Sequence, residues 1–284
     1  MEDRKRREIE HSDRRRSIVK GHEYQTDSSE DLKRADWVKD ERAFQEHFSN
    51  MKFYSITRSS FAHRDACLYD GIHGLTVLDY CCGNGEIAVA MARNGAGLVH
   101  GIDLSPVAIE NAKALSHKEG VADRCVFKVM DAEHTEFPDA FFDRIHEYGA
   151  LHHLDLEAAY RELSRVLKPG GNLICSETMR HNPLIHWYRK STMHLRTQWE
   201  VEHILGEPEI RQGTAYFESV QVRFFHLASL AAVPFRKFHI FPAILTVLEW
   251  VDGFLLHLPW IQRWAWIAVV IYSRPRTSRP LPGH

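Results

Sequence analysis

A short glycine-containing segment follows the first long apolar run of this 284-residue chain and has the residue types of a ligand-binding turn. Residues 79–85 read DYCCGNG, and a stretch with helical periodicity follows them. Glycine allows the backbone to turn sharply and to approach a ligand without an intervening side chain. The next helix would add free backbone amides and the positive end of its dipole. The segment therefore predicts a binding site at this turn.

Acidic residues end the next two apolar runs, where a nucleotide-like cofactor would need them. Asp103 follows the turn by roughly 20 residues, about where an acid takes ribose hydroxyls. Asp131 and Ala132 end the following run, where the same crevice would bind the edge of a base. The spacing Gly83-x-Gly85-x-x-Ala88 also fits the dinucleotide fingerprint, which is a weak signal by itself.

Residues 146–153 read HEYGALHH and hold four candidates for proton transfer, namely Glu147, Tyr148, His152 and His153. Side chains alternate across a strand, so only one of Glu147 and Tyr148 is expected to face the crevice. A histidine suits the deprotonation of a hydroxyl or amine. The alternative for each histidine is structural hydrogen bonding before the next helix.

Alternating strands and helices are expected to position these residues. Helical periodicity covers 86–93, a second helix begins after Ser105 with Pro106 at its first position, and a third follows Asp155. This alternation is typical of an α/β fold with a doubly wound, mostly parallel sheet. Strands are expected at 75–81, 98–104, 125–130, 142–148 and 172–177, with a turn at 168–171 and two further strands at 219–225 and 266–272.

The ordered set of motifs over residues 73–180 resembles the class I S-adenosylmethionine-dependent methyltransferases. The motifs are the DYCCGNG turn after an apolar run, then GIDLS, MDAE, LHHL and LKPGG. The resemblance implies a seven-stranded Rossmann-like sheet, a helical N-terminal lid and helical insertions, with S-adenosyl-L-methionine as cofactor. The one departure is Cys81, because family members usually have glycine there.

The resemblance also implies a role for each matching residue. Amides around Cys81–Gly85 would hold the methionine end, Asp103 the ribose hydroxyls, and Asp131 the adenine amino group. The full set of expected cofactor contacts is Tyr54, Asp79, Cys81, Cys82, Gly83, Gly85, Asp103, Leu104, Asp131, Ala132 and Glu147. Tyr54 is included as a lid residue over the cofactor, with core packing as its alternative.

A dehydrogenase would use the same glycine turn, but it would need neither Asp131 nor the LHHL and LKPGG motifs. The main prediction is methyl transfer to a small, rather hydrophobic acceptor such as a secondary metabolite, isoprenoid, quinone-like molecule or lipid. The alternatives are a protein or RNA methyltransferase and a non-catalytic cofactor-binding regulator. His181, His186, Tyr188, His194 and Arg196 are candidates for contact with the acceptor, Arg196 with an anionic group.

Three zones are expected: a charged helical arm or lid at 1–60, a cofactor-binding core at 61–180, and acceptor-pocket insertions with the last strands at 181–284. For the first 16 residues a solvated, frayed helix is favoured over a lid, and the arginine runs are expected to face solvent. The apolar segment 227–262 has three open interpretations. These are packing against the core or a partner, an apolar acceptor pocket or a membrane-surface helix, and a dimer interface.

The composition of the chain limits the classes of partner, metal and cellular location that are expected. The 36 basic and 38 acidic residues leave a formal charge of −2, which favours no nucleic-acid partner. No metal site is expected, because zinc spacings and HExxH are absent from the sequence. Five scattered cysteines favour a cytoplasmic location, and neither a signal peptide nor a conventional membrane span is expected. Peripheral membrane contact and a homo-oligomer remain open.

Overall fold

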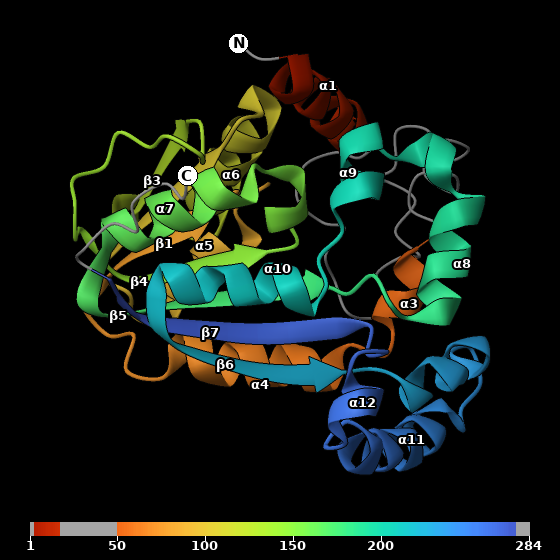
Figure 1. The fold of residues 1–284 in the computed structure, drawn as a ribbon. Helices are drawn as coiled ribbons and strands as arrows, with labels where there is room; N and C mark the ends of the chain where they lie inside the picture. Colours follow the sequence, from red (N-terminus) through yellow and green to blue (C-terminus); the bar gives the residue numbers. More distant parts are fainter. Residues whose placement is uncertain (1–2, 18–49, 277–284) are drawn as a thin grey trace.

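The computed structural model describes residues 3–17 and 50–276, and it is built around one seven-stranded sheet in the order β3-β2-β1-β4-β5-β7-β6 (Figure 1). All neighbouring strands pair in parallel except β7, which is antiparallel to β5 and β6. The α/β, mostly parallel fold predicted from the sequence is confirmed. The strands are β1 (Thr76–Tyr80), β2 (Leu98–Asp103), β3 (Cys125–Val129), β4 (Phe142–Tyr148), β5 (Leu167–Thr178), β6 (Phe217–Phe225) and β7 (Ile267–Pro275).

Helices cover both faces of the sheet, as a doubly wound fold requires. Consecutive residues of β1 point to opposite faces of the sheet and pack into different hydrophobic clusters, Val77 into one and Leu78 into the other. The first cluster also takes apolar residues from α4 (Arg58–Tyr69), α5 (Glu86–Arg93) and α6 (Pro106–Lys118). The second takes them from α7 (Leu156–Val166) and α10 (Glu207–Gln212).

The predicted helix starts are confirmed by their caps. Ser105 Oγ accepts a hydrogen bond from the Ala108 amide at 3.0 Å, and Asp155 does the same for Ala158 at 2.9 Å. Gly85 has a φ of +82°, and a Cβ there would lie 2.7 Å from Ala112 Cβ. Only glycine therefore permits α5 and α6 to approach as they do.

The turn predicted at 168–171 lies instead within β5, which begins at Leu167. Leu167 pairs with Phe142 of β4, and a register shift then separates this pair from Arg144–Asn172. A Cβ at Gly171 would lie 2.7 Å from the Asp143 carbonyl oxygen, so glycine allows the two strands to stay in contact through the irregularity.

The remaining helices lie around this sheet, and some of them add single residues to the core, such as Phe53 of α3 (Met51–Tyr54) and Leu245 of α11 (Phe241–Leu255). Helix α1 (Asp3–Ser17) lies beside the carboxyl ends of the strands, and α11 and α12 (Pro259–Gln262) project at another end of the molecule (Figure 1). No helix within the described residues has the length and apolar character to cross a membrane. The others are α8 (Pro183–Ser191), α9 (Gln198–His203), and the 3-10 turns η2 (Ala122–Arg124), η3 (Leu151–His153), η4 (Met193–Leu195), η5 (Gly213–Ala215) and η6 (Ala228–Phe235).

Candidate functional site

A cavity of about 390 Å³ lies where the carboxyl ends of the parallel strands meet, which is where ligands bind in open α/β sheets. This volume falls in the range of small-molecule sites, roughly 300–1,000 Å³. Ten of the residues predicted from the sequence line it, namely Tyr54, Cys81, Asp103, Leu104, Ala132, Tyr148, His152, His153, Tyr188 and Arg196, whereas the acceptor candidates His181, His186 and His194 do not. The sequence motifs therefore meet in one place.

Asp103 is oriented by two backbone amides at the end of β2. Its Oδ2 accepts from Gly83 N at 3.0 Å and its Oδ1 from Ser105 N at 2.9 Å. Each carboxylate oxygen can accept more than one hydrogen bond, so Asp103 can still take hydroxyl donors from the cavity. Asp131 is held similarly, since its Oδ1 accepts from Glu133 N at 3.0 Å.

Several predicted contact residues support the cavity without lining it. Asp79 is buried, accepts from Ala88 N at 2.9 Å, and lies 2.8 Å from His146 Nδ1. It therefore fixes the start of α5 instead of facing a ligand. The other predicted contacts outside the lining are Cys82, Gly83, Gly85, Asp131 and Glu147.

Cys81 has a φ of +58°, a left-handed conformation that favours glycine. This explains physically why glycine suits the position in the family that the sequence resembles. Burial, followed by the charge of Asp103, raises the pKa of the Cys81 thiol. Because a thiol needs to ionise to be a nucleophile, Cys81 is a wall residue rather than a reactive one.

Two buried carboxyl groups and a histidine form a linked cluster beside the cavity. Glu177 Oε2 lies 2.9 Å from His152 Nδ1, and Glu177 Oε1 accepts from Leu151 N at 2.7 Å. Burial raises the pKa of Glu177, but the charge and hydrogen bond of His152 more than offset this and lower it.

Glu147 has the opposite character within this cluster. It is fully buried, and its Oε1 accepts from the Ala150 and Leu151 amides. Burial and the charge of Glu177 raise the pKa of Glu147 well above its ordinary value, which favours its neutral form. Glu147 thus supports the loop after β4, while Glu177, which the sequence analysis missed, orients the histidine.

Helix α1 forms one wall of the cavity, and this corrects the prediction that it is solvated and frayed. Arg4 donates to both Glu133 oxygens, and Lys5 donates to Asp131 Oδ2 at 2.6 Å. Arg16 Nη2 lies 3.7 Å from Asp103 Oδ2. The side chains of Arg4, Lys5 and Arg16 are only 8%, 13% and 15% exposed, so these basic residues do not face solvent. The predicted lid at 20–60 falls mostly on residues 18–49, outside the described residues.

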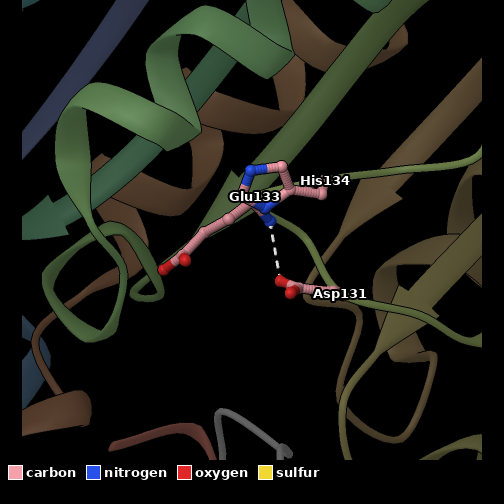
Figure 2. A group of neighbouring side chains, drawn as sticks. All are labelled: Asp131, Glu133 and His134. Carbon is pink, nitrogen blue, oxygen red and sulfur yellow. Dashed lines mark hydrogen bonds between the residues drawn. The ribbon is translucent and has the colours of Figure 1, made fainter. Parts of the chain in front are cut away.

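Asp131, Glu133 and His134 place their ligand atoms within 4.8 Å of one another (Figure 2). Figure 2 shows the Glu133 amide directed at Asp131 while the Glu133 carboxylate points away from it. Because Arg4 and Lys5 already bind both carboxylates, this cluster is an ion-pair network with α1.

Part of the cavity wall is aromatic and comes from α3, from α8 and from Trp266, the residue directly before β7. The Phe53 and Tyr188 rings pack edge to face at 4.9 Å, and the Tyr54 and Trp266 rings at 5.7 Å. Of the insertion at 181–213, six residues reach the cavity, namely Ile185, Tyr188, Arg189, Arg196, Glu200 and Ile204. Of the segment 227–262, none does, so the interpretation of that segment as an acceptor-pocket wall is wrong.

Comparison with known proteins gives a consistent assignment. Residues 77–171 match the model of a methyltransferase domain. The chain is 31% identical over 173 residues to the demethylmenaquinone methyltransferase of Lactiplantibacillus plantarum, covering 57% of this chain and 73% of that protein. It is 42% identical over 101 residues to the 27-O-demethylrifamycin SV methyltransferase of Amycolatopsis mediterranei, which is 35% of this chain but only 37% of that protein.

A solved structure extends the comparison to the whole fold. The geranyl diphosphate C-methyltransferase of Streptomyces coelicolor A3(2), solved with S-adenosyl-L-homocysteine, superposes with a TM-score of 0.58 at 14% identity. The match covers 96% of this chain and 99% of that one. At this identity the likeness concerns the fold.

Proposed function

The chain belongs to the class I S-adenosylmethionine-dependent methyltransferases, and from this premise we propose that it transfers a methyl group to a small, rather hydrophobic acceptor. The observation that supports this most directly is that one cavity is lined both by Asp103, Leu104 and Ala132 and by a group of aromatic side chains. A cofactor and an acceptor would meet between them, near His152.

The residues present fit S-adenosylmethionine. Asp103 presents an oriented carboxylate for ribose hydroxyls, and Leu104 presents an apolar surface for adenine. Asp131 lies outside the cavity lining and accepts from Lys5 and from Glu133 N, so a bond from the adenine amino group would use a remaining lone pair of its carboxylate. Gly83 has no side chain to separate the backbone from a ligand, and a Cβ there would lie 3.1 Å from Arg16 Nη2. When bound, the cofactor supplies an electrophilic methyl group on a sulfonium.

His152 is proposed as the group that removes a proton from the acceptor. Since Glu177 can only accept a hydrogen bond when ionised, His152 Nδ1 carries the proton in their 2.9 Å contact. This leaves Nε2 as the basic nitrogen. The protein would otherwise act by aligning the acceptor and excluding water. Tyr148 also lines the cavity and is proposed to position the acceptor.

The relatives support the acceptor class by their names, which include a demethylmenaquinone, a phytyl-hydroquinone and a sterol methyltransferase. The aromatic wall made by Phe53, Tyr54, Tyr188 and Trp266 would hold such an apolar body. The cavity lining is mostly apolar, as the sequence suggested, but it also holds more ionisable side chains than expected, among them Arg189, Arg196 and Glu200. A cytoplasmic location stays a prediction.

Peripheral contact with a membrane is part of the proposal, and a homo-oligomer is its alternative. The segment 235–264 exposes apolar side chains on α11 and α12 and in the loops beside them. We call this the aromatic surface, and it comprises Phe238, Ile240, Val247, Trp250, Phe254 and Trp260, which are 46–80% exposed. Exposed apolar patches of this kind mark membrane or protein contacts.

Radiolabelled methyl transfer tests the proposal. The protein is incubated with methyl-labelled S-adenosylmethionine and, separately, with a quinol, a sterol, total lipid extract, total protein and total RNA. We expect label in the organic-soluble fraction, lost in His152→Asn although that variant still binds S-adenosylhomocysteine. Label in protein or RNA alone would overturn the acceptor class, and cofactor binding without any transfer would favour a non-catalytic regulator.

A further inference from the structure

Arg189, in the last turn of α8, is a buried cation on the wall of the cavity. Only 7% of its surface is exposed. The one hydrogen bond that its guanidinium makes to a described residue runs from Nη1 to the Met179 carbonyl oxygen at 2.9 Å. A guanidinium has five N–H donors, so this bond leaves most of them for another acceptor.

The acidic residues near Arg189 are already bound to other groups. Arg196, also on the cavity wall, is paired with Glu200. The Glu177 carboxylate accepts from Leu151 N and contacts His152. Among the residues that the structure describes, no carboxylate forms an ion pair with Arg189.

The charge of Arg189 persists in spite of its surroundings. Burial, and then the charge of Arg196, lower its pKa to about 10. Arg189 therefore still carries its positive charge at neutral pH. A buried charge without a counter-ion is unfavourable, and it is relieved when an anion binds. A guanidinium fork matches a carboxylate or phosphate, both of which accept two parallel hydrogen bonds.

We propose that Arg189 binds an acidic group of the acceptor, so that the substrate is an amphiphile with a carboxylate or phosphate on an apolar body. Ile185 and Tyr188 lie on the same helix and line the cavity with Trp266, and they provide apolar contacts for that body. This inference rests on the proposed function only in calling the ligand an acceptor.

The inference is tested by the binding of three probes that share a similar alkyl chain and differ in their polar group. Octanoate, octyl phosphate and octan-1-ol are titrated by calorimetry into the full-length protein saturated with S-adenosylhomocysteine. We expect one or both anions to bind about 10- to 100-fold more tightly than the alcohol, as charge-assisted hydrogen bonds imply. Their ratio distinguishes a carboxylate site from a phosphate site. Equal affinity for the alcohol would overturn the inference.

Substitutions at two positions of α8 test whether Arg189 causes the preference for anions. Arg189→Met should remove the preference for anions, whereas Lys190→Met, which removes the same charge from the exposed neighbour, should retain it. Arg189→Lys keeps the charge without the fork and should show an intermediate preference, which provides a test if the methionine variant does not fold. An anion preference unchanged in a folded Arg189→Met protein would contradict the assignment.

The outcome is separable from that of the proposed function. Binding is measured without methyl transfer, and S-adenosylhomocysteine binding is measured first. If anions bind through Arg189 while S-adenosylhomocysteine does not bind, the anion site stands and the methyltransferase proposal fails. If the cofactor binds and the probes show no anion preference, only the present inference fails.

Discussion

At the scale of single residues, Asp103 is the side chain on which cofactor affinity should depend most. Its replacement by alanine removes two charge-assisted hydrogen bonds to ribose, at about 1.5–3 kcal/mol each. Asp131→Ala should weaken binding less, because apolar packing also holds adenine. Calorimetric titration with S-adenosylhomocysteine measures both.

Glu110→Ala, on the exposed side of α6, is a suitable control for the loss of a carboxylate, since its side chain is 73% exposed. Unchanged affinity in Asp103→Ala would mean that the ribose lies elsewhere. A larger loss in Asp131→Ala than in Asp103→Ala would mean that the adenine contact dominates.

The residues predicted from the sequence are those whose roles depend on local motifs. Asp103 and Ala132 follow strands whose ends must share one edge of the sheet, so their meeting was predictable. Glu177 was missed because nothing near it in sequence indicates that β5 brings it to His152, 25 positions away. Arg189 was missed because its lack of a counter-ion is visible only after the chain has folded.

At the scale of elements, α1 is held on the cavity by a pair of titratable groups. Glu8 Oε2 lies 2.9 Å from His153 Nδ1, and Glu8 Oε1 accepts from Thr197 at 2.6 Å. Burial lowers the pKa of His153, but Glu8 and then the charges of Glu200 and Glu177 raise it overall. The pKa of Glu8 is lowered, since His153 and Thr197 more than offset the effect of burial.

Docking of α1 should therefore weaken as the pH rises. Because docking raises the pKa of His153, the protonated histidine stabilises the docked state fully when the pH is below its pKa in the undocked state, near 6.5. This stabilisation is lost as the pH rises through the higher pKa of the docked state. For Glu8 the stabilisation is lost only as the pH falls through its lowered pKa. Hydrogen exchange protection of the α1 amides, corrected for intrinsic rates, should fall as the pH rises above about 6.5.

His153→Gln serves as the control, because it keeps a hydrogen-bonding group but cannot titrate. In that variant the protection of α1 should no longer vary over this pH range. If wild-type protection is constant with pH, or if His153→Gln keeps the dependence, another group holds the helix. Arg4 and Lys5 would then be the first candidates, through Glu133 and Asp131.

Element types were easier to predict than element partners. Caps and apolar spacing are local, so α5, α6 and α7 begin where the sequence indicated. The apolar spacing of 227–262 correctly indicates a helix, but it does not say which side of the helix is buried. In α11, Leu245 packs inward, whereas Val247, Trp250 and Phe254 are exposed, so the segment lines no pocket.

At the scale of the whole molecule, the proposed membrane contact depends on the charged groups that lie beside the aromatic surface. Its basic neighbours Lys237 and Arg263 are exposed. Its acids are engaged within the protein, since Glu249 pairs with Arg58 and Asp252 is buried, accepting from the amides of residues 227–229. Exposed tryptophan and phenylalanine beside cations are typical of helices that lie in a bilayer interface.

This surface is close to the cavity along the chain, because Trp264 is exposed beside it and Trp266 lines the cavity wall. Vesicle sedimentation measures the contact. We expect the full-length protein to bind vesicles of phosphatidylcholine with phosphatidylglycerol more tightly than vesicles of phosphatidylcholine alone, and the difference to shrink at high salt.

Replacing Trp250 and Phe254 together by serine should weaken binding to the mixed vesicles by at least about tenfold, because each aromatic ring buries apolar area worth roughly 1.5–3 kcal/mol when fully transferred. Val129→Ser, at the 52% exposed position on β3 at the far edge of the sheet, is the control and should bind as wild type does. Lys237→Gln with Arg263→Gln should remove the preference for phosphatidylglycerol. Sedimentation equilibrium tests the alternative of a homo-oligomer. If the wild-type chain is a dimer and Trp250→Ser with Phe254→Ser converts it to a monomer, a second copy of the chain covers these rings, and the membrane role is contradicted.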